Sequence, residues 1–420
     1  MAKKSAHETI YVYADWIGLE QPVLMGLLHS TLRRKKEIFS FKYDEAWLKS
    51  RSAQAFDPHL SLFSDIQSAY DEKPPFGIFL DSSPGRWGRT LMDIRDAITA
   101  QCQGRSSKNL FETEYLLGVY DDCRKGAIRF KELPDGPFLN GDSSIATPSW
   151  SSLRELEYAS LTLEKDTTNN PETLKSINML IASGASLGGA RPKTSIADDQ
   201  GELWIAKFPS LHDKHDVGAW EKVAYDLAKN AGIKVPESTA GKFYSKKHTF
   251  LTKRFDRTPQ RERIHFASAM TLLGHTDGTD YSGVSYLDLA EFIMQYGANP
   301  DADLEELWRR IVFYISVSNT DDHLRNHGFL LTNRGWTLSP AYDINPVPTG
   351  TGLSLKISTT DNALSIDLAL DVAEYFRISD EKATEIISII QHEVSNWEAI
   401  AEKIGISKSE RNAMAKAFKY

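Results

Sequence analysis

The segment 319–343 constrains the fold and chemistry of this chain more than any other part of its sequence. Asp321 and Asn326 are five positions apart, and Asp343 follows Asn326 after sixteen intervening residues. This is the spacing of a kinase catalytic loop, where an aspartate accepts a hydroxyl proton and an asparagine and a later aspartate bind magnesium. The pattern therefore predicts phosphoryl transfer from ATP, with Asp321 as the base and Asn326 and Asp343 as ligands of Mg²⁺.

His323 is a further candidate catalytic residue, because its imidazole could orient a carboxylate or touch a phosphate. The role of its neighbour Asp322 is left open. Polar residues of this kind also end ordinary helices, where they cap free backbone groups. An alternative function uses the same region: a metal-dependent phosphoesterase built on Asp321, Asp322, His323 and Asp343, which would need no ATP.

Lys207 lies near the end of a predicted strand, residues 202–208, on the same face as Leu203 and Ile205. A strand lysine inside a cleft can pair with the α- and β-phosphates of ATP. A lysine whose stem covers apolar surface is the simpler alternative. Glu221, in a predicted amphipathic helix over 218–231, could brace Lys207, although a surface role is equally compatible with its position.

A glycine-rich segment, residues 183–193, precedes this strand, and a further strand is predicted between them over residues 194–197. Its glycines allow the backbone to approach an anion closely, and Gly188, Gly189 and Ala190 lie at its centre. The segment matches neither G-x-x-x-x-G-K-[ST] nor G-x-G-x-x-G. Ser183 and Ser186 offer hydroxyls, and a phosphate on either would put charge where nucleotide phosphates are expected. Self-inhibition by phosphorylation at Ser186 or Ser183 is therefore a hypothesis.

Composition excludes several classes of protein. The 420 residues predict two or three folding units, and a net charge of −8 argues against a chain that grips nucleic acid by itself. Two cysteines are too few for a disulfide framework. The N-terminus lacks the apolar segment of a signal peptide, and no apolar run approaches the length of a membrane span. The expected location is the cytoplasm, without a membrane partner.

Periodicity predicts β-rich structure over residues 8–45 and helices over 75–118. A stretch rich in proline and glycine, Leu133–Trp150, is the best candidate linker, and we place a boundary near residue 146. Beyond residue 256 the pattern becomes helical. Asp301 and Ser379 are each predicted to be the N-cap of a helix. Ser407 and Glu410 are predicted to form a capping box at the start of the last helix.

Five motifs, in order, resemble the HipA family of serine/threonine protein kinases, which are toxins of bacterial type II toxin–antitoxin pairs. They are Ser186-Leu-Gly-Gly-Ala-Arg-Pro-Lys193, Ile205-Ala-Lys-Phe-Pro209, Lys253-Arg-Phe-Asp-Arg257, Asn319-Thr-Asp-Asp-His-Leu-Arg-Asn326 and Leu338-Ser-Pro-Ala-Tyr-Asp343. The segments Phe41-Lys-Tyr-Asp-Glu-Ala-Trp47 and Phe79-Leu-Asp-Ser-Ser-Pro-Gly-Arg86 are loosely similar to the N-terminal region of that family.

The resemblance implies an α+β fold of the HipA type. Its parts would be an N-terminal β-containing subdomain (1–145), a mixed kinase-like N-lobe with the glycine-rich loop (146–256) and a mainly helical C-lobe with the catalytic loop (257–420). ATP would lie between the two lobes. The resemblance also implies that Lys253 and Phe255 meet adenine through backbone groups and that Asp256 lies near the ribose.

The resemblance further implies partners. One is a HipB-like helix-turn-helix antitoxin, through which the chain would meet DNA only indirectly. The other is a protein substrate, of which an aminoacyl-tRNA synthetase is one candidate, whose phosphorylation would inhibit translation and lead to dormancy and persistence. A catalytically silent corepressor of a DNA-binding antitoxin is a second alternative.

Overall fold

A computed structural model of the chain describes residues 7–34, 36–69, 76–141, 147–165, 179–180, 188–276 and 283–420. These residues form two compact units. The first comprises Met1–Ala206, Asp256–Ala267 and Gly274–Thr276, and the second comprises Lys207–Phe255, Ser268–Leu273 and Asp277–Tyr420. Helices and antiparallel sheets occur together in the chain, so the expected α+β class is confirmed.

The first unit is built on a five-stranded sheet in the order β4-β3-β2-β1-β5. Its strands are β1 (His7–Ala14), β2 (Val23–Arg33), β3 (Lys36–Tyr43), β4 (Gln67–Ser68) and β5 (Ile128–Lys131). Alternate residues of β1 face the core: Ile10, Val12 and Ala14 are fully buried, as period-2 patterning requires. Val12 pairs with Gly26, where a side chain would lie 2.3 Å from the carbonyl oxygen of Lys42. Only glycine fits that position in β2.

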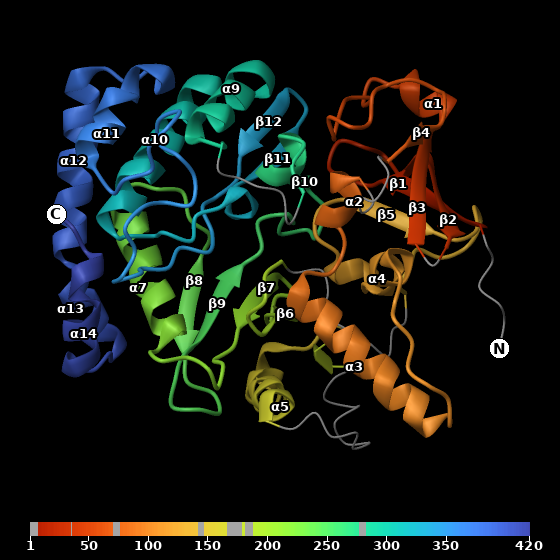
Figure 1. Cartoon of the computed structure of the whole chain (residues 1–420), viewed down its shortest axis with the longest axis horizontal. Helices are drawn as coiled ribbons and strands as arrows, with labels where there is room; N and C mark the ends of the chain where they lie inside the picture. The colour runs from red at the N-terminus through yellow and green to blue at the C-terminus, as the bar shows by residue number, and fades with distance from the viewer. Residues whose placement is uncertain are drawn as a thin grey trace. The chain divides into compact units, whose positions relative to one another are not determined.

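Helices and a second group of strands complete the first unit (Figure 1). The helices are α1 (Glu45–Leu48), α2 (Gly77–Asp81), α3 (Arg86–Cys102), α4 (Glu112–Gly118) and α5 (Leu153–Lys165), with 3-10 turns η1 (Asp121–Cys123) and η3 (Trp150–Ser152). The neighbouring strands β6 (Lys193–Ala197) and β7 (Leu203–Lys207) match the two strands predicted there. Strand β7 ends at Lys207, the first residue of the second unit.

The second unit contains the remaining elements (Figure 1). Its first part holds α7 (Val217–Asn230), β8 (Ser238–Gly241), β9 (Thr249–Lys253), α8 (Ala269–Leu272), α9 (Tyr286–Tyr296) and α10 (Pro300–Ser316). Strand β10 (Phe266–Ser268) begins in the first unit, and its last residue belongs to the second. Its second part holds η4 (Leu324–Asn326), β11 (Gly328–Thr332), β12 (Gly335–Leu338), α11 (Ile366–Asp371), η5 (Ala373–Phe376), α12 (Asp380–Ser395), α13 (Trp397–Ile404), α14 (Lys408–Met414) and η6 (Ala415–Ala417).

Helix α10 forms the core of the second unit. Leu307, Trp308 and Ile311 are fully buried, and the indole of Trp308 donates a hydrogen bond of 2.9 Å to the carbonyl of Ala369. The prediction that Asp301 caps this helix is wrong. The helix begins at Pro300 with Asn299 as its N-cap, because proline at the first helical position needs no partner for a backbone N–H.

The C-terminal helices begin where predicted, with one difference. Ser379 accepts a hydrogen bond from the backbone of Lys382, and Ser407 accepts one from the backbone of Glu410. The side chain of Glu410, however, does not complete the expected capping box. Its Oε1 accepts hydrogen bonds from the Asp216 backbone at 2.7 Å and from the Trp220 indole at 2.9 Å. The carboxylate that the local pattern assigned to the capping box with Ser407 therefore binds residues at the start of α7 instead.

The predicted boundary near residue 146 falls outside the described residues, so the division into 1–145, 146–256 and 257–420 stays a prediction. Among the described residues, no helix is both long enough and apolar enough to cross a bilayer.

Candidate active site

The ammonium of Lys207 forms two ion pairs within the second unit. Its Nζ lies 2.5 Å from Glu221 Oε1 and 2.6 Å from Asp343 Oδ1. The lysine is 8% exposed. Burial alone lowers its pKa, but Asp343 and Glu221 more than offset this effect and raise the pKa above the ordinary value. Lys207 is therefore a charged, buried group aimed at two carboxylates.

Helix α7 carries Glu221, and its first turn is held in place by an aspartate. Asp216 accepts a hydrogen bond from the Ala219 backbone and binds both the backbone and the Nδ1 of His248, the latter at 2.7 Å. The helix also approaches the segment before β9 very closely, since a side chain at Gly218 would lie 2.2 Å from the His248 carbonyl oxygen. Glu221 itself is 1% exposed.

Asp343 is held by its own backbone as well as by Lys207. Its φ of 60° lies in the left-handed region, which aspartate adopts more readily than most residues. Its N–H donates to the Tyr225 hydroxyl oxygen at 3.2 Å, and Asn345 Nδ2 approaches its Oδ1 at 3.4 Å. Sequence reasoning missed Tyr225 and Asn345. The placement of Asn345 two residues after Asp343 was the one signal that could have suggested it.

The loop 319–326 follows α10, and Asn326 braces it. Asn326 Nδ2 donates a hydrogen bond of 2.9 Å to the backbone carbonyl of Asp321, five residues earlier. The amide oxygen of Asn326 makes no hydrogen bond to a described residue and is the atom left for another ligand. Asp321 is exposed, and its role as a base stays a prediction.

Asp322 has a different environment from Asp321. It is 1% exposed, and its Oδ2 accepts hydrogen bonds from His327 Nε2 at 2.9 Å and from the Tyr286 hydroxyl. Burial and Asp322 raise the pKa of Tyr286 well above its ordinary value, so the phenol remains the donor. Asp322 thus fixes the loop 319–326 to two buried side chains.

Two hydrogen bonds join the loop to the segment of Asp343. The Tyr342 hydroxyl donates to the Arg325 carbonyl at 2.7 Å, and the Asn345 backbone donates to Asn319 Oδ1 at 3.0 Å. Arg325 directly precedes Asn326, Tyr342 directly precedes Asp343, and Asn345 follows Asp343 by two residues. The structure therefore brings together the two segments that the spacing in the sequence had singled out.

His323 is half-buried and its backbone closes the loop, because its carbonyl accepts from the Asn326 N–H at 2.7 Å. Its Nδ1 is buried and makes no hydrogen bond with any described residue. A catalytic role for His323 stays a prediction.

The predicted adenine segment lies partly in this unit. Phe255 packs against Tyr342 with ring centroids 5.8 Å apart, and the backbone of Lys253 donates to the Glu237 carbonyl at 2.8 Å. Asp256 belongs to the first unit, where its buried carboxylate accepts hydrogen bonds from the Gly126 backbone at 2.8 Å and from Arg257 at 3.0 Å. Its predicted position near a ribose remains untested.

The described part of the glycine-rich segment lies in the first unit. Gly188, Gly189 and Ala190 are exposed, and Lys193 Nζ donates to the Gly188 carbonyl at 2.6 Å. Gly189 has a φ of 85°, a conformation that favours glycine. Ser183 and Ser186 lie outside the described residues.

Comparison with known proteins agrees with this architecture. Residues 185–413 match the family model described as the HipA-like C-terminal domain, which covers more than half of the chain. The chain belongs to the HipA family. The fold is also similar to HipA of Shewanella oneidensis, solved as a complex of HipA, HipB and operator DNA, with a TM-score of 0.63 and 19% identity over 94% of this chain and 93% of that one. The expected HipA-like fold is confirmed.

Two curated proteins are similar in sequence. The "Putative kinase" of Haemophilus influenzae is 31% identical over 188 residues, which are 39% of this chain and 54% of that protein. The "Putative kinase Y4dM" of Sinorhizobium fredii is 28% identical over 162 residues, 35% of this chain and 38% of that protein. The matched part of the chain thus spans about half or less of the length of these relatives.

Proposed function

We propose that this chain is a serine/threonine protein kinase that transfers the γ-phosphate of ATP to a hydroxyl of a cellular protein. The observation that carries the proposal is the position of Lys207, which is bonded to both Glu221 and Asp343. A buried lysine between a helix glutamate and a metal-binding aspartate is the arrangement that protein kinases use to hold the phosphates of ATP.

The exposed Asp321 suits the role of base. In the proposed reaction the substrate hydroxyl oxygen attacks the γ-phosphorus, the bond to the bridging oxygen breaks, ADP leaves, and Asp321 accepts the hydroxyl proton. Lys207 would offset charge on the α- and β-phosphates. The buried anchor Asp322 would keep the loop rigid, since both of its hydrogen-bond donors are themselves buried.

The residues present fit Mg²⁺. The Asn326 amide oxygen makes no bond to a described residue, the Asp343 side chain is 37% exposed, and the buried Asn345 Oδ1 makes no hydrogen bond with a described residue. Oxygen atoms of this kind are the ligands that Mg²⁺ prefers. Asn326 and Asp343 would hold the ion, which when bound neutralises charge on the phosphates.

The environment of Asp322 argues against the phosphoesterase alternative. That mechanism would draw on Asp322 as a metal ligand, but this carboxylate is 1% exposed and already accepts hydrogen bonds from Tyr286 and His327. Nor would a phosphoesterase explain the two ion pairs of Lys207.

We further propose that the chain acts in the cytoplasm as the toxin of a toxin–antitoxin pair. Membership of the HipA family and the similarity to a HipA solved with HipB and operator DNA support a HipB-like antitoxin as partner. The net charge of −8 fits contact with DNA through that partner rather than directly. The target would be a protein of translation, such as an aminoacyl-tRNA synthetase, and autophosphorylation at Ser186 or Ser183 would limit activity.

Mass spectrometry of the purified protein after incubation with Mg-ATP tests the proposal. We expect phosphate on Ser183 or Ser186 in the wild type, and none in Asp321→Asn protein or when EDTA replaces Mg²⁺. Equal phosphate incorporation in wild type and Asp321→Asn would exclude Asp321 as the base. ATP binding that persists undiminished in Lys207→Ala would favour the phosphoesterase.

A further inference from the structure

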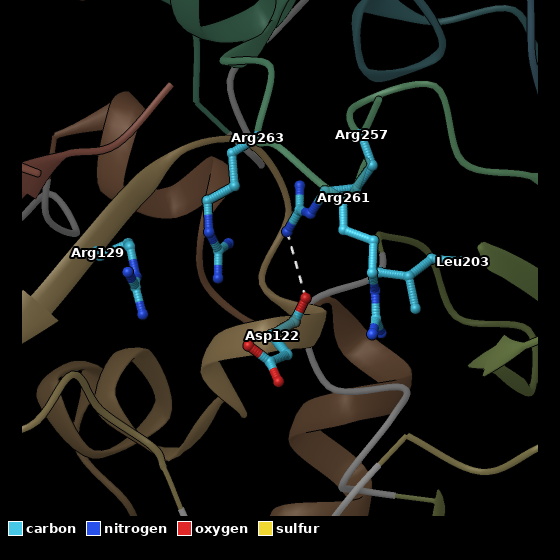
Figure 2. A pocket seen from close by; sticks show the side chains of 6 residues that line it. All are labelled: Asp122, Arg129, Leu203, Arg257, Arg261 and Arg263. Carbon is cyan, nitrogen blue, oxygen red and sulfur yellow. Dashed lines mark hydrogen bonds between the residues drawn. The ribbon is translucent and has the colours of Figure 1, made fainter. Parts of the chain in front are cut away.

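The first unit contains a cavity of about 270 Å³ that is rich in arginine. Figure 2 shows the residues that line it, which are Asp122, Arg129, Leu203, Arg257, Arg261 and Arg263. Each of them belongs to the first unit. Asp122 and Arg129 lie in the neighbouring elements η1 and β5, Leu203 lies in β7, and the other three lie in the segment 256–267. Three separate stretches of sequence therefore line one cavity.

Two of the four arginines are fully used by the protein. Arg257 donates to the backbone carbonyls of Asp122 at 3.2 Å and Arg124 at 2.7 Å. Arg129 donates to Asp15 at 2.9 Å and also pairs with Asp121. These two side chains line the cavity with donors that already have partners in the protein.

Arg263 is only partly used. Its Nη2 donates to the Asp121 carbonyl at 2.8 Å, but its Nη1 is buried and makes no hydrogen bond with a described residue. The side chain is 9% exposed. Burial lowers its pKa, Asp121 opposes this effect and Arg129 adds to it. A buried guanidinium nitrogen without an acceptor is costly, and an anion at this position would remove that cost.

Arg261 provides a second set of unused donors. Its side chain makes no hydrogen bond or ion pair with any described residue, and the residue is exposed and lines the cavity. Its φ of 67° is in the left-handed region, so the backbone turns sharply there. Figure 2 shows its guanidinium and that of Arg263 on the cavity side of their backbones.

The charge at the cavity favours an anion. Four arginines and one aspartate line it. Figure 2 shows the main-chain oxygen of Asp122, and not its carboxylate, facing Arg257. Asp15 and Asp121 pair with Arg263 as well as with Arg129, since Asp121 Oδ2 lies 3.3 Å from Arg263 Nη2 and Asp15 Oδ2 lies 3.9 Å from its Nε. Among the described residues, neither aspartate forms a hydrogen bond with the Nη1 of Arg263 or with the side chain of Arg261.

We propose that this cavity is a binding site for a small phosphate dianion, either inorganic phosphate or the phosphate group of a small ester, held by Arg261 and Arg263. Guanidinium groups match the tetrahedral oxygens of phosphate in planar, charge-assisted pairs. The proposal does not depend on kinase activity, because both arginines belong to the first unit, whereas Lys207, Asp321 and Asp343 belong to the second.

Titration calorimetry of the full chain with inorganic phosphate, and separately with glycerol 3-phosphate, tests this site. We expect saturable binding that Arg261→Gln weakens roughly tenfold, the effect of losing one charge-assisted contact. Tighter binding of inorganic phosphate would identify the free ion as the ligand, and tighter binding of glycerol 3-phosphate would identify an ester.

The matched control is Arg51→Gln. Arg51 is also exposed, lies in the first unit and makes no hydrogen bond or ion pair with a described residue. We expect it to bind phosphate as the wild type does. Absence of saturable binding, or the same affinity in Arg261→Gln as in wild type, would overturn the proposal. Equal weakening by both substitutions would also overturn it, since that would indicate a general effect of charge.

Discussion

Lys207 at the end of β7 and Glu221 in the second turn of α7 form a buried ion pair, with Nζ and Oε1 2.5 Å apart. The lysine is 8% and the glutamate 1% exposed. Water cannot replace either partner, so each charge depends on the other and on Asp343. This pair fixes where the lysine ammonium lies relative to α7.

Lys207→Met leaves Glu221 buried without its cation. We expect a loss of about 3–5 kcal/mol in the free energy of unfolding, as for other broken buried pairs, together with loss of ATP binding. Urea denaturation measures the first effect. Lys222→Met is the control, because Lys222 and Asp226 form an i,i+4 helix pair worth only about 0.3–0.5 kcal/mol. Similar losses in the two variants would contradict the importance of the buried pair.

Asp321→Asn and Asp322→Asn should separate chemistry from folding. Asp321 is exposed, so its substitution should change stability by less than about 0.5 kcal/mol while lowering phosphoryl transfer by roughly a hundredfold or more. Asp322 is buried and accepts two side-chain hydrogen bonds, so its substitution should cost about 1–3 kcal/mol. Thermal unfolding and ATP turnover of both variants give the comparison. The reverse pattern would mean that the two roles are exchanged.

The stability provided by Asp216 should depend on pH. Burial raises its pKa, but hydrogen bonds from His248 and from the backbone of Ala219 outweigh burial and hold the pKa below 3.8. Because its pKa is lower in the folded chain than in the unfolded chain, the ionised carboxylate stabilises the fold above pH 3.8. This stabilisation is lost as the pH falls through the folded-state pKa. Asp216→Asn keeps an N-cap side chain but removes the charge.

We therefore expect Asp216→Asn to be less stable than wild type at neutral pH, with a gap that narrows below pH 3.8. Urea denaturation of both proteins across this range measures the gap. A gap that widened in acid would show that the carboxylate is not stabilised as its hydrogen bonds indicate.

Gly218→Ala tests the close approach of α7 to the segment before β9. The new methyl group would lie 2.2 Å from the His248 carbonyl oxygen, so the helix must shift. We expect a loss of about 1–3 kcal/mol, the usual cost of overpacking, and weaker ATP binding because Glu221 moves with the helix. Gly283→Ala is the control, since no atom of the described residues lies within 4 Å of its new methyl group. Equal stability of the two variants would contradict the close packing.

Local pattern predicted the secondary structure around the site. The helix expected over 218–231 is α7, the two strands after the glycine-rich segment are β6 and β7, and Ser379 and Ser407 cap helices as expected. These features depend on hydrophobic period and on side chains that bond to their own neighbours, which a sequence displays directly. Asp301 was assigned wrongly because Pro300 allowed the helix to begin earlier.

The sequence by itself also singled out Lys207, Asp321, Asn326 and Asp343, because their types and spacing follow a known chemical pattern. Only the tertiary structure decided which of these side chains contact one another and which neighbours are buried. The sequence also suggested Glu221 as a brace for Lys207, and the structure shows that pair. The direct pairing of Lys207 with Asp343, the burial of Asp322 and the contact of Glu410 with α7 were not predicted. Spacing cannot predict such contacts, since they depend on which buried polar groups find partners once the chain has folded.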